Sequence, residues 1–207
     1  MSHIRRAIPN DAFSFLEIKE KMPMPSSMPS TLRGGFLLGT NLATYIHFIQ
    51  NDHCLVCEKD GTITGFGICF ADESFRKSTV WKRRHNAKWL IDVSWIESKR
   101  LCYFEQLAFL KGEKKSILIL VYNLVNLLFA EGHDALITTT VLYPVENRSA
   151  LPFLLAAGGS LAGIIEENYP VIGNITSSIY ILEKHTFYKN LNRHRLGNFL
   201  KKNTILL

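Results

Sequence analysis

The chain has 207 residues, of which 47% are hydrophobic, 20% charged and 11% aromatic, with four cysteines and a formal net charge of +6. This supply of apolar side chains excludes a disordered chain, and four cysteines in so long a chain exclude a disulfide-stabilised scaffold. We expect one cytoplasmic globular domain with reduced cysteines and no signal peptide. The longest apolar run, 117–130, is shorter than the roughly 20 residues that span a bilayer, so it predicts a buried helix.

The positive charge is concentrated near the C-terminus. Residues 184–207 contain six lysines and arginines and no acid, whereas residues 1–183 are balanced, with 18 basic and 18 acidic side chains. A basic segment of this kind can contact nucleic-acid phosphates or an anionic surface. Because it contains no nucleic-acid-binding motif, the simpler interpretation is a solvated basic tail, 184–207, that follows a single domain, 1–183.

The first half of the chain reads as short strands and helices. Three prolines in 21–33 predict a loop that could cover a site, and the pair Asp60-Gly61 predicts a hairpin turn. Apolar spacing in 39–50 predicts a helix that Thr40 or Asn41 can cap. The predicted elements in chain order are a strand at 3–8, a helix from Ala12 capped by Pro9-Asn10-Asp11, the loop at 21–33, the helix at 39–50, and paired strands at 54–58 and 62–70.

The second half changes pattern, because strands here alternate with longer helices. The predicted elements are strands at 87–96 and 101–110, a helix at 116–131 ending at Gly132, a strand at 134–142, a helix at 147–157 ending at Gly158 that Pro152 could bend or shorten, and strands at 160–165 and 175–182. A strand, helix and strand in succession imply a parallel crossover inside an otherwise antiparallel sheet. The predicted class is therefore α+β, or mixed α/β, without a second domain.

The junction between the strand at 101–110 and the following helix is a candidate anion site. The first amide groups of a helix lack intrahelical partners and lie at the positive end of the helix dipole. Three lysines in the segment 111–116 (KGEKKS) reinforce that charge. An ordinary solvated helix start is the alternative, because lysine is common on protein surfaces.

Around this junction the sequence resembles the GNAT superfamily of acyl-coenzyme A-dependent N-acyltransferases, and the resemblance covers nearly the whole chain. It is carried by IRRAIPNDAFSFLEI, LVCEKDGTITGFGICF, YFEQLAFLKGEKKSILILVYNLVNLLFAEG and PVENRSALPFLLAAGG. In the last segment Asn147, Ala150, Phe153 and Gly158 have the spacing of a family helix and its following glycine. The resemblance implies a GNAT-like fold, with helices flanking a mostly antiparallel sheet that contains one parallel, splayed strand pair at 101–110 and 134–142.

The resemblance also implies an acetyl-coenzyme A site. Coenzyme-binding residues would be Leu107, Phe109 and Leu110, through backbone pairing with the pantetheine arm, and Lys111, Gly112, Lys114, Lys115, Ser116 and Ile117, around the pyrophosphate. Asn147 could bond the coenzyme or cap its helix. The family's usual loop, Arg/Gln-x-x-Gly-x-Gly/Ala, is replaced here by a segment with a single glycine. If lysine charge compensates, coenzyme binding should be weaker and more sensitive to salt.

By the same resemblance, the chain would transfer an acetyl or short acyl group from acyl-coenzyme A to an amine by direct attack in a ternary complex. Glu105 is the candidate base for the amine, with a solvent-facing carboxylate as the alternative. Many family members carry a tyrosine where Phe153 stands here, and Tyr143 or Tyr169 could replace it. The degenerate loop and Phe153 leave a second interpretation, an inactive coenzyme A-binding or interaction module.

The acceptor would be a small-molecule or peptide amine, and a homodimer is compatible with the sequence. In the family, residues corresponding to 21–50 and 72–100 select the acceptor, and Trp81, Trp89 and Trp95 could line its pocket. A membrane partner is not expected, and nucleic acid is disfavoured. Cys54 and Cys57 have CxxC spacing without a second ligand pair, so no metal is expected. His133 is interpreted as a turn residue.

Overall fold

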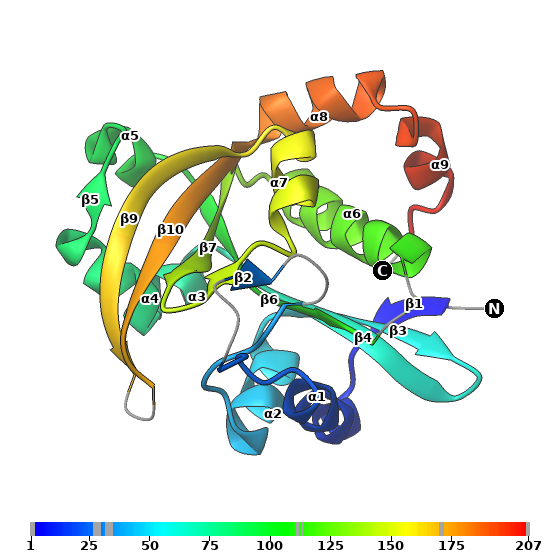
Figure 1. The fold of residues 1–207 in the computed structure, drawn as a ribbon. Coiled ribbons are helices and arrows are strands. Elements are labelled where there is room, and N and C mark those ends of the chain that lie inside the picture. Colours follow the sequence, from blue (N-terminus) through cyan, green and yellow to red (C-terminus); the bar gives the residue numbers. More distant parts are fainter. Residues whose placement is uncertain are drawn as a thin grey trace.

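The computed structural model describes residues 3–26, 30–31, 35–110, 112, 114–169 and 172–205, and its centre is an eight-stranded sheet with helices on both faces (Figure 1). The strand order is β1-β3-β4-β6-β7-β10-β9-β5. In this sheet β6 and β7 are parallel and every other neighbouring pair is antiparallel. The predicted α+β class and the parallel crossover are therefore confirmed.

The strands of the described chain are β1 (His3–Arg6), β2 (Ser30–Thr31), β3 (His53–Lys59), β4 (Thr62–Phe70), β5 (Lys88–Trp89), β6 (Leu101–Phe109), β7 (Ala135–Tyr143), β8 (Glu146–Asn147), β9 (Ser160–Tyr169) and β10 (Gly173–Glu183). The α-helices are α1 (Ala12–Glu20), α2 (Leu42–Asn51), α3 (Asp72–Lys77), α4 (Thr79–Lys82), α5 (Val93–Glu97), α6 (Lys114–Ala130), α7 (Leu151–Ala157), α8 (Lys184–Arg193) and α9 (Gly197–Lys202). Two short 3-10 helices cover Pro9–Asp11 and Arg83–Asn86.

The sheet separates two apolar cores. On one face α1 and α2 pack through Phe15 and Tyr45 against Phe66 of β4. On the other face the long helix α6 supplies Leu120 and Leu124, with further cover from α8 and α9. Figure 1 shows these two groups of helices on opposite sides of the sheet. Two covered faces explain the nearly continuous apolar sequence of the central strands.

Local signals in the sequence correctly located several turns. Asp60 and Gly61 both have positive φ angles, 51° and 77°, as a tight hairpin turn requires. The Asn41 side chain accepts a hydrogen bond from the Thr44 amide at 2.9 Å and so caps α2. Gly132 and Gly158, which follow α6 and α7, have φ angles of 94° and 103°. Glycine adopts this left-handed conformation without steric cost, so both helix ends are confirmed.

Three predicted elements are wrong in extent. The strand predicted at 87–96 is reduced to β5, because the Asp92 carboxylate accepts a hydrogen bond from the Ser94 amide and starts α5 instead. The helix predicted at 147–157 begins only at Leu151, since Pro152 fits the first turn of a helix and not its interior. Part of the predicted loop at 21–33 forms the two-residue strand β2, which pairs in parallel with β8.

Residues 184–205, within the stretch predicted to be a basic tail, form α8 and α9. Phe187, Leu191 and Leu200 are buried in the core beneath these helices. The Lys201 side chain donates to the Asn192 side chain at 2.7 Å, which joins α9 to the end of α8. The cationic side chains of this region face mainly outward, while its apolar side chains help to cover the sheet.

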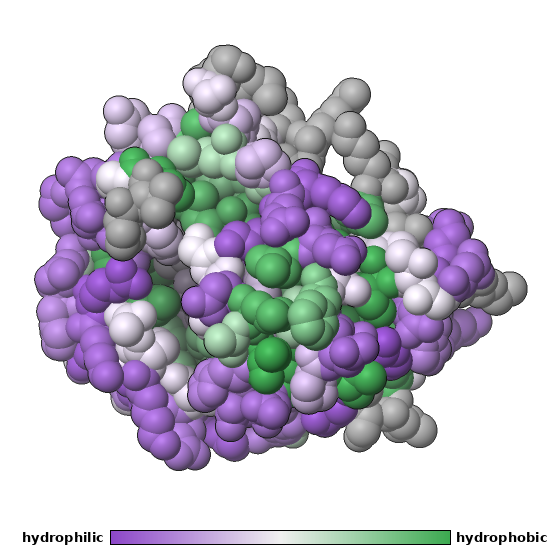
Figure 2. Space-filling model, turned by 90° about the horizontal axis from the view of Figure 1, so that it is seen from below, coloured by the Kyte–Doolittle hydropathy of each residue, from purple (hydrophilic) through white to green (hydrophobic). Residues whose placement is uncertain are grey.

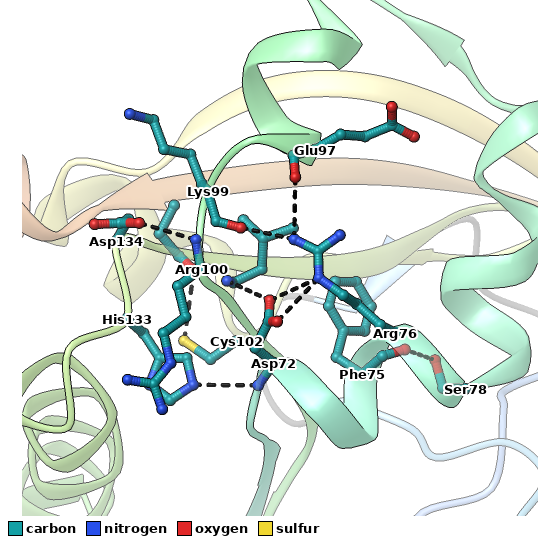
Figure 3. A network of polar contacts seen from close by, with 12 residues as sticks. Asp72, Phe75, Arg76, Ser78, Glu97, Lys99, Arg100, Cys102, His133 and Asp134 are labelled. Atoms are coloured by element: carbon teal, nitrogen blue, oxygen red, sulfur yellow. Dashed lines mark hydrogen bonds and ion pairs between the residues drawn. The ribbon is translucent and has the colours of Figure 1, made fainter.

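A polar cluster holds together the ends of β6 and β7 that lie farthest from the splay described below (Figure 3). The Asp72 carboxylate accepts hydrogen bonds from the Leu101 amide at 2.7 Å and from Arg76. The Asp134 carboxylate accepts from the Arg100 amide at 2.9 Å. The first bond joins α3 to the start of β6, and the second joins the residue before β6 to the residue before β7, so together they fix the relative position of the two strands.

His133 belongs to this cluster, so its interpretation as a simple turn residue is wrong. It is fully buried, with Nδ1 2.7 Å from the Leu128 carbonyl and Nε2 accepting from the Asp72 amide at 3.2 Å. These partners require a neutral ring with its proton on Nδ1. Burial lowers the pKa of His133, and the nearby Arg100 charge lowers it further.

This lowered pKa predicts a loss of stability in mild acid. In the unfolded chain His133 binds a proton near pH 6.5, whereas in the folded chain its lowered pKa opposes protonation. The neutral ring therefore contributes fully to the free energy of unfolding above pH 6.5, and this contribution is lost as the pH falls through the folded pKa. We expect the urea-unfolding free energy to fall between pH 7.5 and pH 5.5. The variant His133→Asn should be less stable at pH 7.5 and should show a shallower decline, and equal declines in both proteins would contradict the assignment.

Candidate active site

A gap opens in the sheet where β6 and β7 separate. The two strands pair from Leu101 opposite Ala135 to Phe104 opposite Thr138, although β6 continues to Phe109 and β7 to Tyr143. At the last pair the Thr138 hydroxyl donates to the Phe104 carbonyl at 2.9 Å. A side chain therefore takes the place of the next backbone bond, and the splayed pair expected from the resemblance is present.

Glu105 occupies a bulge of β6 beside this gap. Ile68 of β4 lies opposite Gln106 and the next residue, Cys69, lies opposite Phe104, so Glu105 is the extra residue on β6. Such a bulge changes the direction of the strand and redirects the side chain at that position. The Glu105 side chain lines the cavity described below, so the alternative of a solvent-facing carboxylate is not what the structure shows.

The backbone of β6 beyond the bulge offers unpaired groups to the gap. The Leu110 amide donates to the Thr64 carbonyl of the β4 edge at 2.8 Å. Because successive residues of a strand direct their backbone groups to opposite edges, Leu107 and Phe109 direct theirs toward β7. These two residues have the orientation expected for backbone pairing with an extended ligand, whereas the Leu110 amide is already bonded to β4.

A cavity of about 260 Å³ passes through the gap. On the α3–α4 side it is lined by Trp81, Trp89, Glu105, Glu167 and Tyr169, and on the α6–α7 side by Val121, Val125, Asn147, Phe153 and Leu154. Figure 2 shows the molecule from below, where the surface is hollowed and its rim is mainly hydrophilic. One continuous cavity thus connects the two faces of the sheet, so two molecules could meet inside it.

The electrostatics of the cavity centre on two carboxylates. Burial raises the pKa of Glu105 to about 7, the hydrogen bond from Gln106 opposes that rise, and the negative charge of Glu167 adds to it. The Glu167 side chain is only 8% exposed and pairs with Arg83 at 3.0 Å. A carboxylate whose pKa is close to neutral can take up a proton at physiological pH, as a general base requires.

A chain of hydrogen bonds fixes the residue next to Glu105. The Tyr45 hydroxyl donates to the Gln106 side-chain oxygen at 2.9 Å, and the Gln106 amide nitrogen donates to the Thr40 hydroxyl at 2.7 Å. Both ends of the Gln106 side-chain amide are therefore hydrogen-bonded. The bulge is thereby attached to α2 and to the segment that precedes it.

The predicted phosphate-binding segment is described only in part. Lys111 lies outside the described residues, and α6 begins at Lys114 directly after the junction. Gly112 has a φ of 104°, and apart from its chain neighbours no atom of the described residues lies within 4 Å of the position that a Cβ would take. The Lys115 side chain is exposed, Ser116 is buried and Ile117 is half-buried. The role of this segment in binding pyrophosphate stays a prediction.

Asn147 does not cap α7, because it lies in β8 before the helix begins. Its side-chain oxygen accepts a hydrogen bond from Ser149 at 2.9 Å, and its nitrogen donates to the Phe36 carbonyl at 3.2 Å. Asn147 thus holds the segment 35–38 against the cavity. The Asn147 amide nitrogen carries a second hydrogen, so it could donate to a ligand while it keeps its bond to Phe36.

The aromatic candidates are distributed unequally. Phe153 and Tyr169 line the cavity, whereas Tyr143 is 63% exposed at the end of β7. Trp81 also lines it, and its ring centre lies 4.9 Å from the Arg76 guanidinium carbon and 4.5 Å from that of Arg84. Trp89 lines it too. Trp95 instead contributes to a separate surface hollow.

Sequence reasoning missed Glu167 and Arg83. Both come from elements far from β6 in the sequence, and no motif surrounds them, so only the folded chain places them beside Glu105. All four cysteines are buried as free thiols. Within the described ranges no group of three or more His, Cys, Asp or Glu could hold a metal, and no helix is long and apolar enough to cross a membrane.

No protein-family model matches the sequence, and a search of curated proteins finds no match. Solved structures do match, and the three named here each match 88% of this chain. They include the ribosomal-protein-S18-alanine N-acetyltransferase of Escherichia coli (12% identity, 94% of that chain, TM-score 0.58). Another is the yncA protein of Salmonella typhimurium, described as an acetyltransferase and solved with its cofactor acetyl-CoA (11% identity, 94% of that chain, TM-score 0.59). A third is an acetyltransferase of the GNAT family from Streptococcus pneumoniae (12% identity, 99% of that chain, TM-score 0.54). The chain therefore has the GNAT fold.

Proposed function

We propose that this chain is an N-acyltransferase that moves an acetyl or other short acyl group from acyl-coenzyme A to an amine. The observation that carries the proposal is the cavity through the splayed β6–β7 pair, with Glu105 inside it. Structures of the same fold include one solved with acetyl-CoA, which supports the same donor here. The donor would enter from the α6–α7 side and the amine from the α3–α4 side.

The proposed reaction is direct attack in a ternary complex. The amine nitrogen forms a bond to the thioester carbonyl carbon, the carbon–sulfur bond breaks, and the sulfur leaves as coenzyme A thiolate. The nitrogen must lose a proton, and Glu105 is the proposed acceptor because its pKa of about 7 is matched to that task. Backbone groups of Leu107 and Phe109 would hold the donor.

The leaving sulfur can depart without a dedicated acid. Phe153 lines the cavity but has no proton to give. A thiol with a pKa near 8.5 leaves readily as the anion, so the absence of an acid there should slow the reaction rather than stop it. Tyr169 is the proposed substitute, because it lines the same cavity as Glu105.

The acceptor end fits an amine that arrives with a positive charge. Glu105 and Glu167 line it together, and Arg83 forms its ion pair with Glu167 while its charge also acts on Glu105 from farther away. An ammonium group would therefore be attracted before it gives up its proton. The aromatic rings of Trp81 and Trp89 would contact the apolar part of a small-molecule or peptide acceptor.

The function is tested by measuring free thiol released from acetyl-coenzyme A in the presence of a panel of primary amines. We expect release that depends on both the amine and the protein. Tight binding of acetyl-coenzyme A with no release for any amine would favour the inactive binding module instead. Absence of binding at both low and high salt would overturn both interpretations.

The single glycine of the junction should be sensitive to substitution. Gly112→Ala introduces no clash, but an L-residue at a φ of 104° costs roughly 1–2 kcal/mol, so the segment should change conformation. We expect calorimetry to show acetyl-coenzyme A affinity reduced about 5-fold to 10-fold. Gly173→Ala is the matched control, with a φ of 87° and similarly open surroundings among the described residues at the start of β10, and it should leave that affinity unchanged.

A further inference from the structure

A cationic surface lies on the side of the sheet opposite α1 and α2 (Figure 1). We define it by the exposed side chains on and around α8 and α9, namely Lys189, Arg193, Arg195, Lys201 and Lys202. Among the residues that the structure describes, none of these five side chains forms an ion pair with an acid. The charge of this surface is therefore not neutralised by the protein itself.

A shallow hollow adjoins the cationic surface and adds aromatic rings to it. Its walls include Trp95, Lys99, Tyr188 and Lys189. The Lys99 ammonium lies 5.4 Å from the centre of the Trp95 ring. Asn192 also lines the hollow and accepts the hydrogen bond from Lys201, so the hollow and the cationic surface are continuous.

Two acids face this hollow, Asp134 and Glu183. The Asp134 carboxylate already accepts a hydrogen bond from the Arg100 amide, which directs it toward the starts of β6 and β7. Glu183 is the exposed acid at the start of α8. The hollow and the cationic surface together contain Lys99 and the cations of α8 and α9. These positive charges outnumber the two acids, so the net charge of the region is positive.

We propose that this surface binds single-stranded nucleic acid. Lysines and arginines contact phosphates without regard to sequence, and the half-buried Trp95 ring that lines the hollow offers a surface on which a base can stack. An anionic membrane would favour protruding apolar side chains, but among the described residues of this region Phe187, Leu191 and Leu200 are buried, Leu196 and Ile205 are half-buried, and Phe199 is 37% exposed. This binding would be independent of acyl transfer, because none of these side chains is among the proposed catalytic groups.

The test uses the full chain and a fluorescein-labelled 12-nucleotide oligouridylate, with anisotropy measured from 50 to 200 mM salt. We expect binding that weakens as salt increases. Lys189→Glu/Arg193→Glu should weaken it more than 10-fold and lower the slope of log affinity against log salt by about 1.4, the value for two lost phosphate contacts on a single strand. Trp95→Leu should weaken it about 5-fold through lost stacking.

The matched control is Lys21→Glu/Lys82→Glu, which reverses two exposed cations on the opposite side of the sheet. It should change the affinity by less than 2-fold. An equal loss in this control, or no anisotropy change for the unmodified protein, would overturn the proposal. Binding to phosphatidylserine vesicles without binding to the oligonucleotide would overturn it as well. The unmodified protein and the three variants should all transfer the acyl group at the same rate. A failure to bind the oligonucleotide can therefore be distinguished from a failure of acyl transfer.

Discussion

Replacing Glu105 by glutamine should reduce turnover of acetyl-coenzyme A and an amine by at least about 100-fold at pH 7, the range for loss of a general base. Glutamine keeps the size and polarity of the side chain but cannot accept the proton. Since the proposed donor contacts are backbone groups of neighbouring residues, the affinity for acetyl-coenzyme A should change by less than about 3-fold. Steady-state kinetics with calorimetric titration of the donor measures both quantities.

The pH dependence gives an independent check of the same residue. A base with a pKa of about 7 is active when deprotonated, so kcat/KM of the unmodified protein should rise as pH increases through 7 and then level off. In Glu105→Gln that rise should disappear. Glu166→Gln is the matched control, because Glu166 is an exposed neighbour of Glu167 on β9, and it should keep both the rate and the rise. A Glu105→Gln protein with the full rate would exclude the proposed base.

Phe15→Ala should cost about 3–5 kcal/mol in the free energy of unfolding, the range for deleting a fully buried aromatic side chain. The Phe15 ring stacks on Phe66 with 4.0 Å between centroids and meets Tyr45 edge-on at 5.5 Å. Truncation would leave a cavity between α1 and the sheet that these rigid neighbours cannot fill. Because the Tyr45 hydroxyl bonds to Gln106, the same change should loosen the attachment of the β6 bulge.

The control for this prediction is on the same helix. Phe13 of α1 is 54% exposed, so Phe13→Ala should change the unfolding free energy by no more than about 0.5 kcal/mol. Both variants lose the same atoms from the same element, and urea denaturation compares them directly. Similar losses in the two variants would mean that α1 does not pack as described.

The cavity explains why a chain with a degenerate phosphate segment can still be proposed as a transferase. The contacts offered by Leu107 and Phe109 come from the backbone, and the gap depends on where β6 and β7 stop pairing. Neither feature requires the additional glycines of the family loop. With a single glycine, the backbone of the junction can approach a diphosphate less closely. We expect this to lower the affinity for the donor and to leave the gap itself intact.

Much of the fold could be predicted because its signals are local. A capping asparagine at 41, a turn glycine at 61 and a C-terminal glycine at 132 act on neighbouring residues only, so the sequence pattern alone indicates where those elements end. The predictions failed at 87–96, where a capping aspartate competed with an apparent strand pattern. They also failed at the start of α7, where the effect of Pro152 on the preceding residues outweighed the apolar spacing.

By itself, the sequence determined the α+β class, the parallel crossover and the place of Glu105 on the strand before the long helix. Only the tertiary structure decided that Glu105 lies on a bulge beside a gap, that Glu167 and Arg83 share its cavity, and that His133 is buried among the starts of two strands. It also decided that the basic C-terminal region covers a core. The physical reason is that a bulge, a pKa raised by burial and a contact between distant strands depend on how separate segments pack, and no local pattern of residue types encodes that packing.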